Sequence, residues 1–210
     1  MQNKLFFLMA GLMSLACNKH KDEWWIKGTV KNALDGSEMS NLEVKAEVKK
    51  IESGVYNDII TTASEDNTDA SGSYEMIWKR ENIAYCRVVA SQANYFDAVV
   101  EVSPDDMKPG EAFVQDLQMT PRSDLQIHIG STDPSALVKL AVFTDDPYCT
   151  CNDDGEYSFI GNMDTTINCM AAGGQWLKYQ IQAFGSNGNV FHLDSVFCEP
   201  FVISNIQYIY

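Results

Sequence analysis

The sequence predicts an all-β protein built from two tandem β-sandwich domains. Apolar residues fall in short alternating or continuous runs, and Gly, Asn, Asp, Ser and Pro separate these runs. After residue 16 almost no stretch shows the 3.6-residue repeat of an amphipathic helix. An apolar content of 45%, with 11% aromatic residues, is typical of a globular chain and not of a disordered acidic one.

The first predicted domain spans residues 24–121 and contains seven candidate strands. Between residues 42 and 49 every second residue is apolar and the others are Glu or Lys, the pattern of a strand buried on one face. Turn-forming residues separate this run from its neighbours. The seven strands are predicted at residues 25–31, 42–49, 57–62, 74–78, 84–91, 96–102 and 113–119.

The second predicted domain spans residues 122–210. It begins after Pro121, because proline cannot donate to a strand ladder and commonly closes a strand. The sequence Gly-Ser-Asn-Gly-Asn at 185–189 predicts a hairpin loop. No sequence repeat relates the two halves. Strands are predicted at residues 125–129, 137–143, 157–160, 165–170, 176–184, 190–197 and 202–210.

Three motifs follow one another in the first predicted domain. They are Ile26-Lys27-Gly28-Thr29-Val30, Asn41-Leu42-Glu43-Val44 and Thr68-Asp69-Ala70-Ser71-Gly72-Ser73-Tyr74. Together they resemble the carboxypeptidase regulatory-like domain. The resemblance implies a seven-stranded, transthyretin-like sandwich with an Ig-like Greek key and no catalytic residues. The acid-rich stretch at 64–67 departs from the family pattern and is interpreted as an insertion.

The amino-terminal segment predicts export. A polar start with one cation, Lys4, precedes twelve uncharged residues at 5–16. A helix of this length is about 18 Å long, too short for a hydrocarbon core of roughly 30 Å. Residues 1–16 are therefore interpreted as a signal peptide.

The end of that segment predicts a lipid anchor. Ser14-Leu15-Ala16-Cys17 resembles the lipobox of bacterial lipoproteins, which implies that Cys17 is acylated and bound to outer-membrane lipid. Residues 17–23 would form a tether. Asp22 and Glu23 resemble the acidic surface-export signal of Bacteroidetes lipoproteins. The expected location is the cell envelope, as a surface-exposed outer-membrane lipoprotein, with a periplasm-facing protein as the alternative.

Net charge excludes one class of partner. The chain carries a formal charge of −14, and removal of residues 1–16, which include Lys4, makes it −15. Such an acidic protein is repelled by nucleic acid, so no nucleic-acid partner is expected.

Five cysteines lie beyond Cys17. Four of them, Cys149, Cys151, Cys169 and Cys198, are candidates for disulfides in an oxidising compartment. Two cysteines only two residues apart close a bridge poorly, so Cys149 and Cys151 are expected to pair with Cys169 and Cys198, in either combination. A four-thiolate zinc site is the less favoured alternative. Cys86 lies in an apolar run and is expected to be a buried free thiol.

No cofactor or metal is expected. Asp66, Asp69, Asp153 and Asp154 lie in acidic turns and are weak candidates for calcium ligands, although their spacing is not that of an EF-hand. The pair His20 and Glu23 has the spacing of a zinc-peptidase motif, but it falls in the tether and is interpreted as a chance match.

One pair of residues could take part in acid–base chemistry. His192 and Asp194 are two apart and lie on one face of a predicted strand. No Gly-x-Ser-x-Gly motif accompanies them, so they are interpreted as surface polar residues.

Aromatic side chains are the candidate ligand contacts. Alternation along a strand forces either Trp24 or Trp25 to face outward, so these two are the first ligand-facing candidates. Other aromatic residues could stack on sugars or fill the core. They are Tyr56, Trp78, Trp176, Tyr208 and Tyr210.

These observations predict a protein that is not an enzyme. It would be a lipid-anchored binding or assembly accessory of the cell envelope that presents β-sandwich loops to a protein or glycan partner. One alternative is a hydrolase whose site lies in the second domain, at His192 and Asp194 or in the acidic loops. A passive structural spacer is the other.

Overall fold

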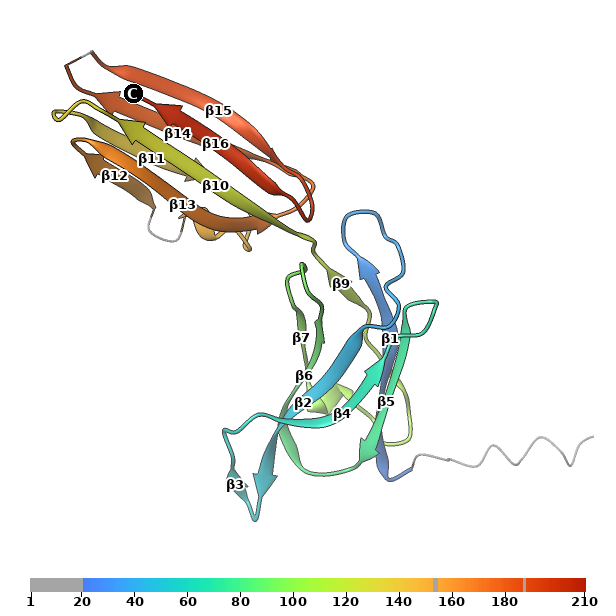
Figure 1. Cartoon of the computed structure of the whole chain (residues 1–210). Coiled ribbons are helices and arrows are strands. Elements are labelled where there is room, and N and C mark those ends of the chain that lie inside the picture. The colour runs from blue at the N-terminus through green and yellow to red at the C-terminus, as the bar shows by residue number, and fades with distance from the viewer. Residues whose placement is uncertain (1–20, 153–154, 187) are drawn as a thin grey trace, which may run out of the picture. The chain divides into compact units, whose positions relative to one another are not determined.

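A computed structural model describes residues 21–152, 155–186 and 188–210 and confirms the nearly all-β fold (Figure 1). Within these ranges the helical elements are two short 3₁₀ turns, η1 (Pro104–Asp106) and η2 (Thr150–Asn152). The predicted signal peptide, Cys17, the first part of the tether, Asp153 and Asp154 lie outside the described residues. None of the described helices is long and apolar enough to span a membrane.

The described chain divides into two compact units. The first contains residues up to Val30 together with Ser40–Val89 and Val99–Leu117, and the second contains Lys31–Met39, Ala90–Ala98 and Gln118–Tyr210. The boundary at residue 121 between independently folding domains stays a prediction.

Two sheets make up the strands of the first half. In one, β1 (Glu23–Asn32) pairs antiparallel with β5 (Ser73–Lys79) and parallel with β8 (Phe113–Val114), and β9 (Leu117–Met119) also pairs with β1. The other has the order β3-β2-β6-β7, and β4 also pairs with β2. Its strands are β2 (Glu43–Glu52), β3 (Val55–Tyr56), β4 (Thr61–Asn67), β6 (Ile83–Ser91) and β7 (Ala98–Val102).

Two further sheets form the second half. One has the order β13-β10-β16 and the other has the order β12-β11-β14-β15. Apart from the parallel pair of β10 with β16, the registers of this half are antiparallel. The strands are β10 (Arg122–Ser131), β11 (Leu137–Phe143), β12 (Glu156–Ile160), β13 (Met163–Ala172), β14 (Gln175–Phe184), β15 (Val190–Cys198) and β16 (Ile203–Ile209).

The two halves share one strand order although their sequences do not repeat. In each, the first long strand (β1 or β10) has an antiparallel partner on one side (β5 or β13) and a parallel partner on the other (β8 or β16). The second (β2 or β11) also has neighbours on both sides. The two-sandwich fold predicted from the sequence is therefore present, with the same topology twice.

Alternating apolar residues build both cores. The inward residues Val44, Ala46 and Val48 of β2 have no exposed surface, as the alternation at 42–49 predicts. In the second half, Leu177 and Ile181 of β14 are buried with residues of β10 and β11. Each large side chain buried in this way contributes roughly 1.5–3 kcal/mol through the hydrophobic effect.

Two predicted strands of the first half differ from the structure. The strand predicted at residues 113–119 is divided into β8 and β9. A strand was expected at residues 57–62 and an insertion at 64–67, but β4 runs from Thr61 to Asn67 and includes the acidic stretch. It pairs with β2 through Val44↔Asp66 and a bulge between Ala46 and Glu47. Because its side chains are mostly exposed or half-buried, β4 carries no alternating apolar pattern to reveal it.

Candidate functional site

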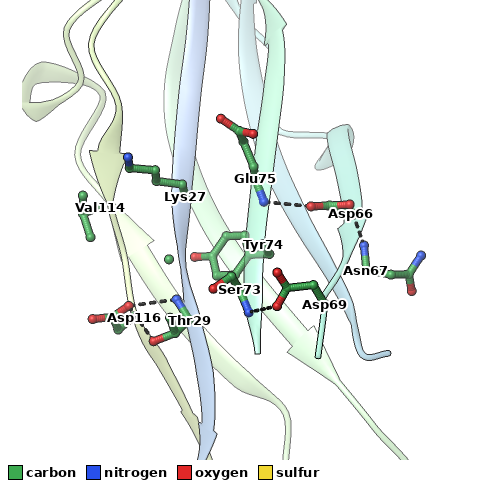
Figure 2. A pocket seen from close by; sticks show the side chains of 11 residues that line it. Lys27, Thr29, Asp66, Asn67, Asp69, Ser73, Tyr74, Glu75, Val114 and Asp116 are labelled. Carbon is green, nitrogen blue, oxygen red and sulfur yellow. Dashed lines mark hydrogen bonds between the residues drawn. The ribbon is translucent and has the colours of Figure 1, made fainter. Parts of the chain in front are cut away.

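A polar hollow lies at one end of the first sandwich (Figure 2). Four parts of the chain line it: β1 with Lys27 and Thr29, the end of β4 with Asp66, the turn into β5 with Asp69, and the chain at β8 with Asp116. Its volume is about 670 Å³. Four carboxylates and one ammonium group line it, so the hollow is strongly polar and carries a net negative charge.

Most of the carboxylates in this hollow are bound to the protein itself. Asp116 Oδ1 accepts hydrogen bonds from the Thr29 amide and hydroxyl, and Asp66 Oδ2 accepts one from the Glu75 amide at 2.7 Å. Asp69 Oδ1 accepts from Ser71 and Ser73. These bonds, led by the Ser71 hydroxyl, lower the pKa of Asp69. The carboxylates therefore stabilise the turn and the strand edges.

The same bonds bear on the predicted calcium ligands. Asp66 and Asp69 both line this hollow. Asp69 holds the turn that precedes Tyr74, and Asp66 accepts from the Glu75 amide and so holds the edge of β5. Among the described residues no group of three or more His, Cys, Asp or Glu is arranged to hold a metal ion. Asp153 and Asp154 lie outside the described residues.

The motif around Tyr74 has a clear structural role. Gly72 has a φ of +70°, which favours glycine, and Tyr74 is 3% exposed with its hydroxyl donating to the Gln115 carbonyl. Burial raises the pKa of this tyrosine. The motif thus fixes a turn and anchors β5 to the chain beside β8.

The paired tryptophans lie on opposite faces of β1. Trp24 is 7% exposed, its Nε1 donates to the Glu81 carbonyl, and the Arg80 guanidinium lies over its ring. As alternation predicts, one of the two faces outward and the other does not: β1 turns Trp24 toward the core, so Trp24 is not the outward-facing member of the pair. Trp25 lies on the opposite face of β1, is half-buried, and has the Lys27 ammonium 5.4 Å from its ring centroid.

His192 and Asp194 do lie together in the second sandwich. His192 Nε2 is 3.5 Å from Asp194 Oδ2, and the rings of Tyr179 and Tyr208 lie 6.1 and 6.4 Å from the imidazole. Burial and the Asp194 carboxylate raise the pKa of Tyr179. Among the described contacts of this pair, none brings a serine or cysteine side chain to the imidazole as a nucleophile.

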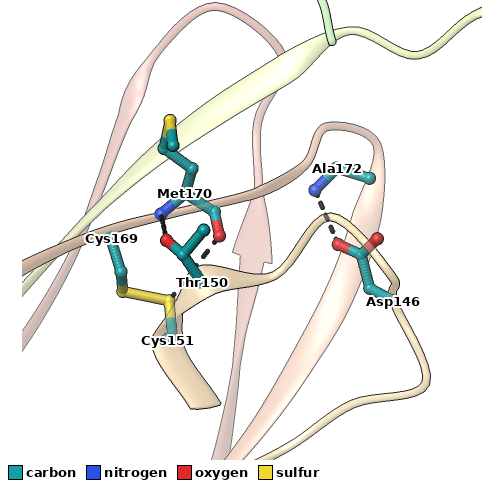
Figure 3. The surroundings of a disulfide bond; sticks show 6 residues. All are labelled: Asp146, Thr150, Cys151, Cys169, Met170 and Ala172. Carbon is teal, nitrogen blue, oxygen red and sulfur yellow. Dashed lines mark hydrogen bonds between the residues drawn. A yellow bond between two sulfur atoms is a disulfide. The ribbon is translucent and has the colours of Figure 1, made fainter. Parts of the chain in front are cut away.

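A disulfide joins η2 to β13 (Figure 3). Cys151 is bonded to Cys169, and the Met170 amide donates to Thr150 Oγ1 at 2.9 Å beside it. Asp146, in the loop before η2, also binds to β13, because its carboxylate accepts a hydrogen bond from the Ala172 amide. One bridge among the four predicted cysteines is therefore present.

The remaining cysteines are buried. No disulfide joins Cys149 to Cys198 in the described structure, so the expectation that both Cys149 and Cys151 are bridged holds for Cys151 alone. Cys149 and Cys198 nevertheless belong to the same buried cluster as the Cys151–Cys169 bridge. Cys86 has no exposed surface, and burial raises its pKa to about 11, as expected for a buried thiol.

The outer face of β14 and β15 carries large exposed apolar side chains. Opposite residues in an antiparallel pair lie on the same face, and Trp176 is opposite Phe197, Gln180 opposite Leu193 and Gln182 opposite Phe191. Trp176, Phe191 and Leu193 are each more than 60% exposed. We call the set Trp176, Phe191, Leu193 and Phe197 the aromatic face.

A polar hollow of about 600 Å³ adjoins this aromatic face at Trp176. The Trp176 and Phe197 rings are 5.4 Å apart and tilted by 57°. Asp145 and Lys178 also line the hollow, and neither side chain is hydrogen-bonded or ion-paired to another side chain among the described residues. Asp146, by contrast, holds the loop by accepting from Gln175 Nε2 and the Ala172 amide. The hollow therefore places the exposed indole ring of Trp176 beside the charged side chains of Asp145 and Lys178.

Only part of this site is predicted by the sequence. Trp176 is among the aromatic candidates, whereas Phe191, Leu193 and Phe197 are predicted only as parts of a strand. A signal was present: the segment at 190–197 has apolar residues at both odd and even positions. A strand with one solvated face should alternate, so the excess apolar residues indicate an outward apolar surface.

Comparisons with known proteins identify no family. No family model matches the chain, and no curated protein matches it. The resemblance to the carboxypeptidase regulatory-like domain therefore stays a prediction.

Solved structures offer only distant similarity. The streptococcal ancillary pilin is 11% identical, with a TM-score of 0.30, over 88% of this chain and 62% of that one. The minor pilin GBS52 of Streptococcus agalactiae is 9% identical, with a TM-score of 0.33, over 89% and 94%. A Bacteroides uniformis protein named as a candidate carbohydrate-binding protein is 11% identical, with a TM-score of 0.30, over 82% and 98%. Similarity at this level carries no conclusion about function.

Proposed function

We propose that this chain is a lipid-anchored, non-catalytic binding protein of the cell envelope that holds glycans on the outer face of β14 and β15. Acylation of Cys17 would attach it to the outer membrane, facing outward. The observation that carries the glycan proposal is the exposed Trp176 ring beside the polar hollow.

The chemistry of this site suits a sugar. A pyranose ring has an apolar C–H face, which packs on an aromatic ring, and hydroxyl groups that both donate and accept hydrogen bonds. The Trp176 indole supplies the ring surface, with Phe197 beside it. Asp145 would accept hydrogen bonds from hydroxyl groups and Lys178 would donate to them.

The extended apolar surface supports a polymeric ligand. Phe191 and Leu193 continue the face along β15 beyond the hollow, with Gln180 and Gln182 beside them on β14. Several large exposed apolar side chains gathered on one face, with polar residues between them, are typical of an interaction site. Several sugar units of one chain could lie along it.

The experiment is affinity electrophoresis of the solubilised full-length chain in gels containing soluble polysaccharides. Trp176→Ala should weaken retardation about tenfold or more, as for an aromatic residue at the centre of a binding site. Trp25→Ala removes an indole from a half-buried strand position elsewhere and is the matched control. Equal loss in both variants, or retardation by no polysaccharide, would contradict the proposal.

The hydrolase alternative is tested with the same material. Chromatography of the polysaccharide after incubation should show no shortened products. If products form and His192→Ala with Asp194→Ala abolishes them, the protein is an enzyme. The spacer alternative predicts no saturable ligand for any variant.

A further inference from the structure

The free edge of β16 is unusual among the sheet edges of this protein. β16 (Ile203–Ile209) is hydrogen-bonded to β10 on one side only and ends the β13-β10-β16 sheet (Figure 1). Its sequence, Ile-Ser-Asn-Ile-Gln-Tyr-Ile, contains no charged residue, no proline and no glycine. Such an edge presents unpaired backbone donors and acceptors to a further strand.

The other long edge strands carry charged residues, which protect a sheet edge against the addition of a further strand. Among the described edge strands of five residues or more, charged residues occur in all except β16. Charges on an edge oppose the addition of another strand. Those in the second half are Glu156 in β12, Asp164 in β13 and Asp194 in β15, and those in the first half are Glu75 in β5 and Glu101 in β7.

The residues of β16 also match themselves when the strand is reversed. About Ile206 as the centre, Asn205 corresponds to Gln207, and Ile203 corresponds to Ile209. All four belong to the exposed face of the strand, where Ile203 is 56% and Ile209 is 62% exposed. An antiparallel pair of two such strands would set amide against amide and isoleucine against isoleucine.

We propose that β16 pairs antiparallel with β16 of a second copy of this chain, about a two-fold axis at Ile206. The two three-stranded sheets would then form one continuous six-stranded sheet. A two-fold contact requires a surface complementary to itself, which the reversed match of β16 provides. A slip of one residue is disfavoured, because it would place Asn205 opposite Ile206, which is 4% exposed and faces the core. A slip of two residues would set Asn205 against Asn205 and would lose the pairing of Ile203 with Ile209.

Electrostatics favours this edge for contact between identical chains. Each copy carries a formal charge of −14, so two copies repel each other over most of their surfaces. An uncharged strand is the place where two acidic chains approach at least cost. This inference does not rest on glycan binding, because the aromatic face lies on the opposite sheet.

The register gives a sharp test by disulfide cross-linking. Two differently tagged full-length copies, one Asn205→Cys and one Gln207→Cys, are produced together in the envelope and oxidised with copper phenanthroline. Directly opposite residues have Cβ atoms about 4.5–5.5 Å apart, whereas identical positions would be diagonal neighbours at roughly 7–8 Å. A disulfide needs a Cα separation of about 4.4–6.8 Å. The mixed pair should cross-link at least several-fold more than either variant with itself.

A second experiment uses charge in place of cysteine. In Asn205→Glu/Gln207→Glu, each carboxylate would face another across the two-fold axis, so light scattering of the detergent-solubilised chain should show a monomer where the wild type is a dimer. Gln92→Glu/Ala93→Glu adds the same charge at exposed loop positions and should remain dimeric. Circular dichroism checks that both variants fold.

Several results would overturn the proposal. They are a monomeric wild type at all concentrations, equal cross-linking of mixed and single cysteine variants, and loss of the dimer in both charge variants. Cross-linking of the cysteine variants to a different protein would also overturn it, because the edge would then belong to another partner.

Discussion

Gly28 in β1 lies directly against the backbone of Gln115. A Cβ atom at residue 28 would overlap the Gln115 carbonyl oxygen, far inside any contact distance. The same oxygen accepts the hydrogen bond from the Tyr74 hydroxyl. The central glycine of the Ile-x-Gly-x-Val motif is therefore needed so that the chain beside β8 can approach β1.

Gly28→Ala should destabilise the first unit strongly, because the backbone of Gln115 must move to admit a methyl group. The expected loss in the free energy of unfolding is about 1–3 kcal/mol or more. Gly36→Ala is the control, since a Cβ there meets nothing within 4 Å and only its φ of +72° opposes the change. Urea titration followed by tryptophan fluorescence measures both. Similar losses for the two variants would show that the close approach is not limiting.

Reduction of the Cys151–Cys169 disulfide should lower the stability of the second unit. The bridge joins residues 18 apart in the sequence, and closing a loop of this length stabilises a fold by about 3 kcal/mol. Cys151→Ala/Cys169→Ala should reproduce the effect of dithiothreitol on the denaturation midpoint. Wild type with dithiothreitol and the double variant without it are then compared. If dithiothreitol destabilises the double variant further, another bridge contributes.

Sequence patterns were sufficient for most of the fold because most of the long strands bury one face. The alternation in β2 and β14 gave their positions closely, and the glycine and aspartate of the turn before Tyr74 indicated the start of β5. β4 was misplaced because an edge strand of polar residues carries no such pattern.

The candidate site was harder to predict. Trp24 and Trp176 are chemically alike, and only the direction of each strand in the fold decides which indole is exposed. Trp24 turns into the core and Trp176 turns outward. Phe197 belongs to the site because it lies opposite Trp176 in the β14–β15 pair. This cross-strand register cannot be read from the sequence. Pairing of Cys151 with Cys169 depends in the same way on tertiary contacts of η2.

Cys86 and Cys198 should be unreactive in the native protein. Burial raises the pKa of each thiol to about 11, and for Cys198 the nearby Cys149 and Asp146 add to the effect. At pH 8 only about one thiol in a thousand would be ionised, and the thiolate is the reactive form. Mass spectrometry after iodoacetamide treatment should find both unmodified without denaturant and modified in guanidinium chloride. Rapid native modification of Cys198 would mean that the end of β15 opens readily.

Asp133 should make the stability of the second unit depend on pH in the acid range. Its two oxygens accept four hydrogen bonds, from the amide and hydroxyl of Ser135 and of Ser186, and the residue is 8% exposed. These bonds, with the Ser186 hydroxyl first, lower its pKa well below the ordinary value. In the unfolded chain the carboxyl titrates near pH 3.9. The stabilisation is therefore complete above that value and is lost as the pH falls toward the folded-state pKa.

Asp133→Asn tests this directly, because an amide keeps the shape but can accept at only one of the two positions. The melting temperature of the variant should be several degrees lower at pH 7, and the difference from wild type should shrink between pH 5 and pH 2. Asp97→Asn, at an exposed loop position, is the matched control and should follow the wild type at every pH. Calorimetry over this range measures all three proteins. A difference that stays constant with pH would show that Asp133 acts through packing and not through its charge.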